Sequence, residues 1–213
     1  MIELFNSGGS FMYVILTVSI VALAFFCERA SFLYFRLNLN YDKAFQKILV
    51  SLERSNYHGA IEECAKIEKH PLGRILKAGL LKSDKRDKEI ELAMEENILR
   101  EIPLVKRRIN YLALFANIAT LLGLLGTILG LIAAFEGVSA ADAAMKQQIL
   151  AKGISVAMLT TAFGLVVAIP CLIGFYALNN RGDFIIDQFE EKALKLFNAL
   201  STLKREKELV CQN

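Results

Sequence analysis

Residues 109–135 read INYLALFANIATLLGLLGTILGLIAAF and contain no Asp, Glu, Lys or Arg. An α-helix rises about 1.5 Å per residue, so this stretch is long enough to cross the hydrocarbon core of a bilayer, which is about 30 Å thick. Two further stretches also lack charged residues: 4–27, which is most apolar over 11–27, and 153–180. The three stretches together predict three transmembrane helices.

The basic residues are unevenly divided among the remaining segments. Residues 1–10 contain no Lys or Arg, 28–108 contain seventeen, 136–152 contain two and 181–213 contain six. Basic loops stay on the cytoplasmic side of a membrane, so we expect 1–10 and 136–152 to be periplasmic and the other two segments cytoplasmic. The net charge of +3 then reflects orientation. Acidic residues are interleaved with the basic ones, which argues against binding of nucleic acid.

The first apolar stretch could also be interpreted as a cleaved signal peptide. No Lys or Arg precedes it, its apolar run is too long, and it ends in Phe26 and Cys27 rather than in small residues. We therefore expect it to be retained as a transmembrane helix.

The charged segments carry helical periodicity and no strand signals. Phe45, Ile48 and Leu52 predict a helix over 42–57, and a short helix is expected over 60–68. Further along, the sequence predicts a helix starting at Pro71 and a long helix from a cap at Ser83 or Asp84 to Arg108, with a kink at Pro103. The third apolar stretch has no stop signal after Asn180 except Gly182, so we expect its helix to continue into the tail from Arg181 and to pack against the long helix.

These observations define the predicted fold class, an all-α membrane protein with three transmembrane helices, long cytoplasmic helical extensions and its N-terminus outside. The predicted helices span 11–27, 109–135 and 153–180. The predicted cytoplasmic parts are a helical domain over 28–108 and a C-terminal helix over 181–213.

None of the three spans contains an ionisable side chain that could carry a proton through the membrane. His58 and His70 have no Cys or Asp at metal-ligand spacing, and phosphate-binding, serine-hydrolase and zinc motifs are absent. We therefore expect no enzymatic activity, no metal and no cofactor. The chain is either a scaffold or one wall of an ion path whose charged group comes from another chain.

Small residues form one face of the second and third spans. Small faces allow two helices to approach closely in lipid. A Thr on such a face can bond a carbonyl of its own helix, or it can offer its hydroxyl to water or to a proton carrier. The second span carries Gly123, Thr127, Gly130 and Ala134, with Gly126 beside them, and the third carries Ala157, Thr161, Gly164 and Ala168.

The run Leu121–Ile132 closely resembles the second-helix signature of the ExbB/TolQ proton-channel family, which is related to flagellar MotA. The segments around Gly153, Thr161–Leu165 and Ala168–Pro170 resemble the third helix of that family. Weaker similarities lie over Pro71–Leu80 and at Glu28 and Arg29.

The resemblance implies an inner-membrane protein of bacteria that forms a homopentamer around a pore. Two copies of an ExbD- or TolR-like partner with one membrane helix sit in that pore, and the partner's Asp carries the proton. A TonB- or TolA-like chain is a possible further partner. By the same match, Thr127 and Thr161 fall on pore-lining threonines, and Pro170 shapes the third helix.

Two positions depart from the family pattern. Val156 stands where many ExbB and TolQ chains have a Glu, and Thr120 stands where a Pro is common. These departures leave open a gliding-motor or MotA-like branch. Arg107 and Arg108 are candidate lipid-facing residues at the basic edge of the second span.

Three hypotheses follow from the sequence. The first is a subunit of a motor driven by the proton-motive force, with the small faces lining a pore. The second is a non-conducting membrane scaffold in which those faces only pack helices, and the third is a channel that conducts by itself. The sequence does not identify the envelope process, the ion, the direction of rotation or the coupling ratio.

Overall fold

The computed structural model describes residues 11–37, 41–54 and 56–212, with side chains described up to residue 206. The structure is 88% helical, and the described residues form no β-strand. Three helices are long and apolar enough to cross a membrane. The prediction of an all-α membrane protein with three spans is confirmed, while the orientation of its N-terminus stays a prediction.

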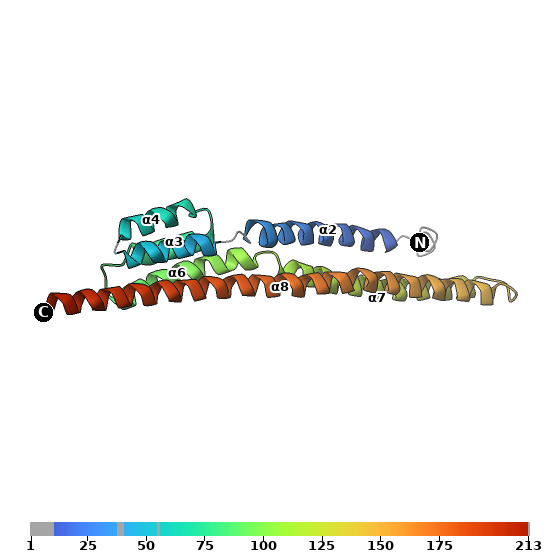
Figure 1. Cartoon of the computed structure of the whole chain (residues 1–213). Coiled ribbons are helices and arrows are strands. Elements are labelled where there is room, and N and C mark those ends of the chain that lie inside the picture. Colours follow the sequence, from blue (N-terminus) through green and yellow to red (C-terminus); the bar gives the residue numbers. More distant parts are fainter. Residues whose placement is uncertain (1–10, 38–40, 55, 213) are drawn as a thin grey trace. The chain divides into compact units, whose positions relative to one another are not determined.

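The helices follow one another with short connections (Figure 1). The element η1 is one short π-helical segment that continues the first helix. The bounds are α2 Phe11–Ser31, η1 Phe32–Arg36, α3 Asp42–Glu53, α4 Tyr57–Lys66, α5 Pro71–Leu80, α6 Asp87–Lys106, α7 Asn110–Ser139 and α8 Lys146–Gln212.

The chain divides into two compact units. The first, named the apolar unit, combines the residues up to Ala30 with Arg108–Asn179. The second, named the charged unit, combines Ser31–Arg107 with the residues from Asn180 onward. Helix α8 contributes its first half to the apolar unit and its second half to the charged unit.

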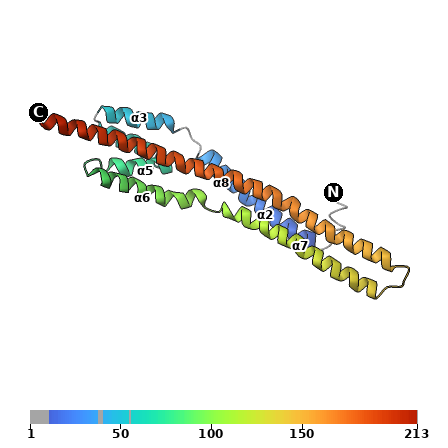
Figure 2. The same ribbon diagram turned by 90° about the horizontal axis from the view of Figure 1, so that it is seen from below.

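In the apolar unit, α7 and the first half of α8 run antiparallel and side by side (Figures 1 and 2). Their shared core includes α2, because Ile15 packs with Ala116, Ala119, Val167 and Ala168. Large apolar side chains cover the outside of these helices: Leu121 is 64% exposed and Val166 is 63% exposed. Such outward-facing apolar residues suit a lipid environment and would be costly in water.

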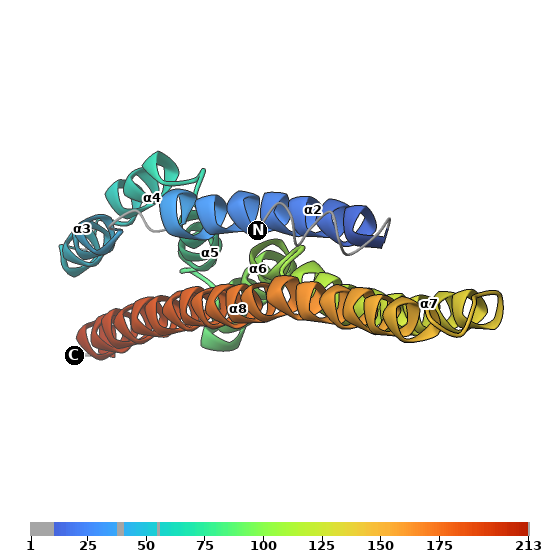
Figure 3. The same cartoon turned by 90° about the vertical axis from the view of Figure 1, so that its right-hand side faces the viewer.

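In the charged unit, α3, α4, α5 and α6 pack as successive neighbours (Figure 3). Amphipathic faces explain this packing, since Ile48 and Leu52 of α3 are fully buried while Lys43 and Lys47 are exposed. The Ser201 hydroxyl on α8 donates to the Asp87 carboxylate on α6 at 2.9 Å. The prediction that the tail helix packs against the helix preceding the second span is therefore confirmed.

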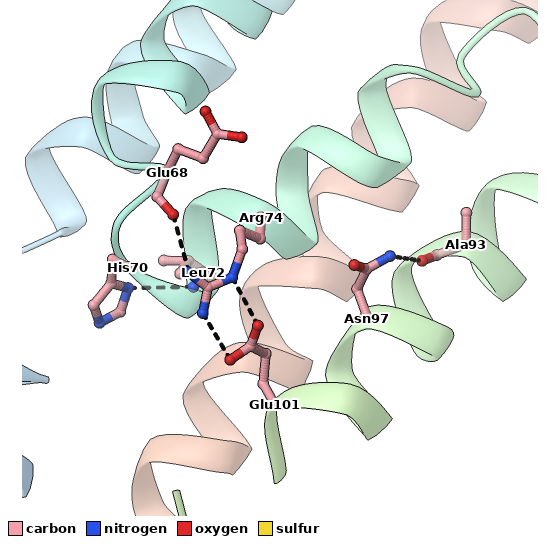
Figure 4. A network of polar contacts seen from close by, with 7 residues as sticks. All are labelled: Glu68, His70, Leu72, Arg74, Ala93, Asn97 and Glu101. Atoms are coloured by element: carbon pink, nitrogen blue, oxygen red, sulfur yellow. Dashed lines mark hydrogen bonds and ion pairs between the residues drawn. The ribbon is translucent and has the colours of Figure 1, made fainter. Parts of the chain in front are cut away.

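The start of α5 is fixed by a network of polar contacts (Figure 4). Its first residue is Pro71, and His70 caps the helix by accepting a hydrogen bond from the Leu72 amide at Nδ1, at 3.2 Å. Arg74 then joins α5 to α6, because its Nε and Nη2 donate to the Glu101 carboxylate at 2.7 and 2.8 Å. The prediction of a break at His70 followed by a helix from Pro71 is confirmed.

Several predicted helix boundaries were wrong. The helix expected over 42–57 ends at Glu53, and the next one runs over Tyr57–Lys66 instead of 60–68. The Asn56 side chain accepts a hydrogen bond from the Gly59 amide and caps α4. This cap starts a new helix at the position where the apolar periodicity had suggested one continuous helix.

The long helix expected over 84–108 begins at Asp87, with Arg86 at its N-cap, and Ser83 and Asp84 do not cap it. It continues through Pro103 for one turn and ends at Lys106. Arg108 then adopts a left-handed backbone conformation with φ of 63°, which a helix cannot continue. The chain therefore turns at Arg107 and Arg108, before α7 begins.

Candidate functional site

The small residues of α7 and α8 meet in a seam inside the apolar unit. A seam residue is defined here as a small residue of one helix that lies against the other helix. From the N-terminal end of α7 onward, Gly123 lies against Thr161 and Gly164, Gly126 against Thr160, Gly130 against Ala157, and Ala134 against Gly153. This antiparallel register brings both predicted small faces together.

The backbones in the seam approach too closely for larger side chains. A methyl group added at Gly164 would lie 2.7 Å from the Ala119 carbonyl oxygen and 3.0 Å from the Gly123 Cα. A methyl group added at Gly130 would lie 3.0 Å from the Ala157 Cβ. Glycine is therefore needed at these positions for the close approach, and both helices pack without large side chains between them.

The two predicted threonines occupy different environments. The Thr161 hydroxyl crosses the seam and donates to the Gly123 carbonyl at 2.9 Å. The Thr127 hydroxyl donates to the Leu124 carbonyl of its own helix at 2.6 Å, and its side chain is partly exposed. Thr161 thus links α7 to α8, while Thr127 lies beside the seam with an oxygen that can still accept a hydrogen bond.

Thr160 is a seam residue that sequence reasoning missed. It is 2% exposed, its hydroxyl donates to the Ala157 carbonyl at 2.7 Å, and its side chain fills the space beside Gly126. Gly153 was likewise missed. Both continue the spacing of Ala157 and Gly164 at intervals of three and four residues, so the same helical periodicity could have found them.

Ala134, Ala157 and Ala168 are buried in the apolar unit, at 2–3% exposed. Ala168 belongs to the core that also holds Ile15 of α2. Pro170 is exposed on α8 and lines an apolar groove of about 530 Å³ that opens between α2 and α8. These positions place Ala134 and Ala157 in the seam, and Ala168 and Pro170 on the side of α8 that faces α2.

The charged groups of the apolar unit lie at the ends of its helices. The Arg108 guanidinium forms an ion pair with the Glu28 carboxylate at 2.6 Å. Glu136 is exposed near the opposite end of α7. Arg107 is exposed and belongs to the charged unit. Over the lengths that cross a bilayer, the polar side-chain atoms of α7 and α8 belong to Ser, Thr and Asn residues and to Tyr111, Cys171 and Tyr176.

This arrangement limits the chemistry of the chain. The seam is closed by direct packing, so a path for ions would have to run along an outer surface of α7 and α8. Hydroxyl groups can orient water or accept a hydrogen bond from a protonated acid, but they do not release a proton near neutral pH. A proton carrier must therefore come from another molecule if this unit conducts protons.

Comparison with known proteins agrees with these features. Residues 67–191 match the MotA/TolQ/ExbB proton channel family. An ExbB-like biopolymer transport protein of Synechocystis sp. is 34% identical over 168 residues, covering 78% of this chain and 79% of that protein. A biopolymer transport protein named as an ExbB homolog from Methanothermobacter thermautotrophicus is 29% identical over 191 residues, covering 89% of this chain and 66% of the relative.

Proposed function

Because the chain belongs to the MotA/TolQ/ExbB proton channel family, we propose that it is the pore-forming subunit of a motor driven by the proton-motive force. Several copies, five by analogy with the family, surround an ExbD- or TolR-like partner with one membrane helix. The partner's Asp carries the proton. The complex lies in the inner membrane, with the segments 28–108 and 181–213 in the cytoplasm, and energises an envelope process, with a TonB- or TolA-like chain as a further partner.

The observation that carries this proposal is the absence of any Asp, Glu, His, Lys or Arg within 109–135 and 153–180. A chain of a proton channel family without its own carrier needs a partner to supply one, because a hydroxyl does not titrate near neutral pH. Val156 stands where many ExbB and TolQ chains have a Glu, so the third helix also lacks a carboxylate that could carry the proton.

Thr127 and Thr161 are the proposed pore-lining residues. The Thr127 oxygen can accept a hydrogen bond from a protonated partner acid while its own proton remains on the Leu124 carbonyl. Thr161 acts from the seam, where its bond to the Gly123 carbonyl holds the two pore helices in register. Loss of either hydroxyl is expected to impair ion movement without preventing insertion or assembly.

The test measures proton flux in liposomes that contain this chain and a partner encoded by a neighbouring gene. Thr127→Val and Thr161→Val keep the side-chain shape, and both are expected to assemble and to lose flux. Thr120→Val is the matched control, since the Thr120 hydroxyl also donates to its own helix, at the Ala116 carbonyl, 3.0 Å away. Full flux in both valine variants at positions 127 and 161 would refute their role.

A non-conducting scaffold is the second candidate, and the closed seam favours it. In that case Thr127→Val is silent, whereas Gly130→Leu abolishes assembly because Gly130 lies against Ala157. A third arm of the flux experiment contains this chain without partner. We expect little flux there, and strong flux would instead support a channel that conducts by itself.

A further inference from the structure

A shallow groove opens on the surface of the charged unit between α6 and α8. Its volume is about 220 Å³. Met94, Ile98 and Ala193 are buried beneath it, while Leu194 is 60% exposed at its edge. The groove therefore presents a small apolar surface to the outside.

Three carboxylates surround this apolar surface. Glu91 and Glu95 come from α6 and Glu190 from α8, and all three are exposed. Within the described residues none of the three forms an ion pair. An apolar surface rimmed by uncompensated negative charge suits a helix face that combines an apolar residue with basic ones.

The same unit carries such a face on α3. Lys43, Lys47, Val50 and Arg54 follow one another at intervals of four, three and four residues, which places them on one side of the helix. All four are exposed, Val50 by 42%, and they lie opposite the buried Ile48 and Leu52. The basic residues form no ion pair with a described residue, although Lys47 acts electrostatically on Glu63 of α4.

We propose that the basic face of α3 in one copy of the chain docks on the acidic groove between α6 and α8 of the next copy. The occupant is a second copy because the two surfaces match in charge and each offers one exposed apolar residue, Val50 or Leu194. Contact between two different surfaces of identical chains is heterologous, and a heterologous contact closes into a ring when its rotation permits. The inference rests on the proposed assembly of several copies and adds which surfaces join them.

Disulfide cross-linking between copies tests the contact directly. Full-length chains lacking their native cysteines carry either Val50→Cys or Leu194→Cys and are co-reconstituted in one membrane before mild oxidation. Dimers are expected from the mixture and not from either variant alone. Leu81→Cys replaces Val50→Cys in the control, because Leu81 is also exposed, by 59%, but belongs to neither surface. Equal cross-linking with the control would overturn the proposal.

Charge reversal then tests complementarity. Lys47→Glu or Glu95→Lys alone should lower cross-linking about fivefold, because a surface attraction becomes a repulsion of similar size. The double variant should restore it, which a folding defect would not do. Unchanged cross-linking in both single variants would refute the charge match.

The oligomeric mass of the same samples, measured by light scattering, distinguishes failure of the proposed contact from failure of the proposed assembly of several copies. A stable ring without cross-linking between positions 50 and 194 refutes these surfaces and leaves the ring intact. A monomeric chain in the presence of its partner refutes the ring and the contact together.

Discussion

Gly164→Ala is expected to weaken the packing of α7 against α8 measurably. The added methyl group would lie 2.7 Å from the Ala119 carbonyl oxygen and 3.0 Å from the Gly123 Cα, and both are backbone atoms that no rotamer change can move. The helices must therefore separate by about 0.5 Å, and overpacking of this kind costs about 1–3 kcal/mol.

Two further effects enter the balance at Gly164. Separation also strains the Thr161 hydrogen bond to Gly123, which is worth about 0.6 kcal/mol inside a membrane protein. The better helix propensity of Ala returns about 1 kcal/mol. The expected net loss is about 1–2 kcal/mol in the free energy of unfolding.

Gly137→Ala is the matched control on α7. It gains the same helix propensity, and its methyl group would meet only the Ile149 Cγ2 at 2.9 Å, the end of a flexible side chain. The assay follows labelling of Cys171, which packs at the edge of the core of the apolar unit, during titration with SDS in chains without other cysteines. Equal midpoints for Gly164→Ala and Gly137→Ala would refute the reasoning.

Burial lowers the pKa of His70 to about 4, so below pH 6.5 the unfolded chain binds a proton that the folded chain does not. The free energy of unfolding should therefore be highest above pH 6.5 and fall by about 3 kcal/mol towards pH 4. His70→Asn, which keeps a helix-capping oxygen, should remove this dependence in pH-dependent denaturation. Arg74→Met should cost about 2 kcal/mol in thermal unfolding because it leaves the buried Glu101 carboxylate unpaired, and adding Glu101→Leu should recover most of the loss. In denaturant, the Arg108→Gly variant should have a free energy of unfolding about 1 kcal/mol higher than the Arg108→Ala variant, because both lose the ion pair to Glu28 and only Gly adopts φ of 63° without strain. Equal stability of the two variants would contradict this.

Much of the helical architecture could be predicted from local sequence. Long stretches without charge give the apolar helices, and Pro71 after His70 gives the start of α5, because each signal is complete within a few neighbouring residues. The start of α6 at Asp87 and the left-handed conformation of Arg108 were not predicted. Arg86 has no side-chain cap, and an arginine with positive φ has no sequence signal.

The seam was only partly accessible to sequence reasoning. Spacing identified Gly123, Gly130, Ala157 and Gly164 as members of small faces, since helical periodicity is a local property. Spacing did not show that Thr161 donates across the seam while Thr127 donates within its own helix. The two hydroxyls have the same chemistry, and only the position of the opposite backbone distinguishes them.

By itself, the sequence determined a membrane protein with three long uncharged stretches, because length, apolarity and the absence of charged residues within those stretches can be counted along the chain. Tertiary structure decided the antiparallel register in which Gly126 lies against Thr160 and Gly164 against Ala119. It also decided that Leu194 stays exposed beside carboxylates that form no ion pair with a described side chain. Both depend on distances between atoms that are far apart along the chain, and such distances are set by packing of the whole unit rather than by local residue preference.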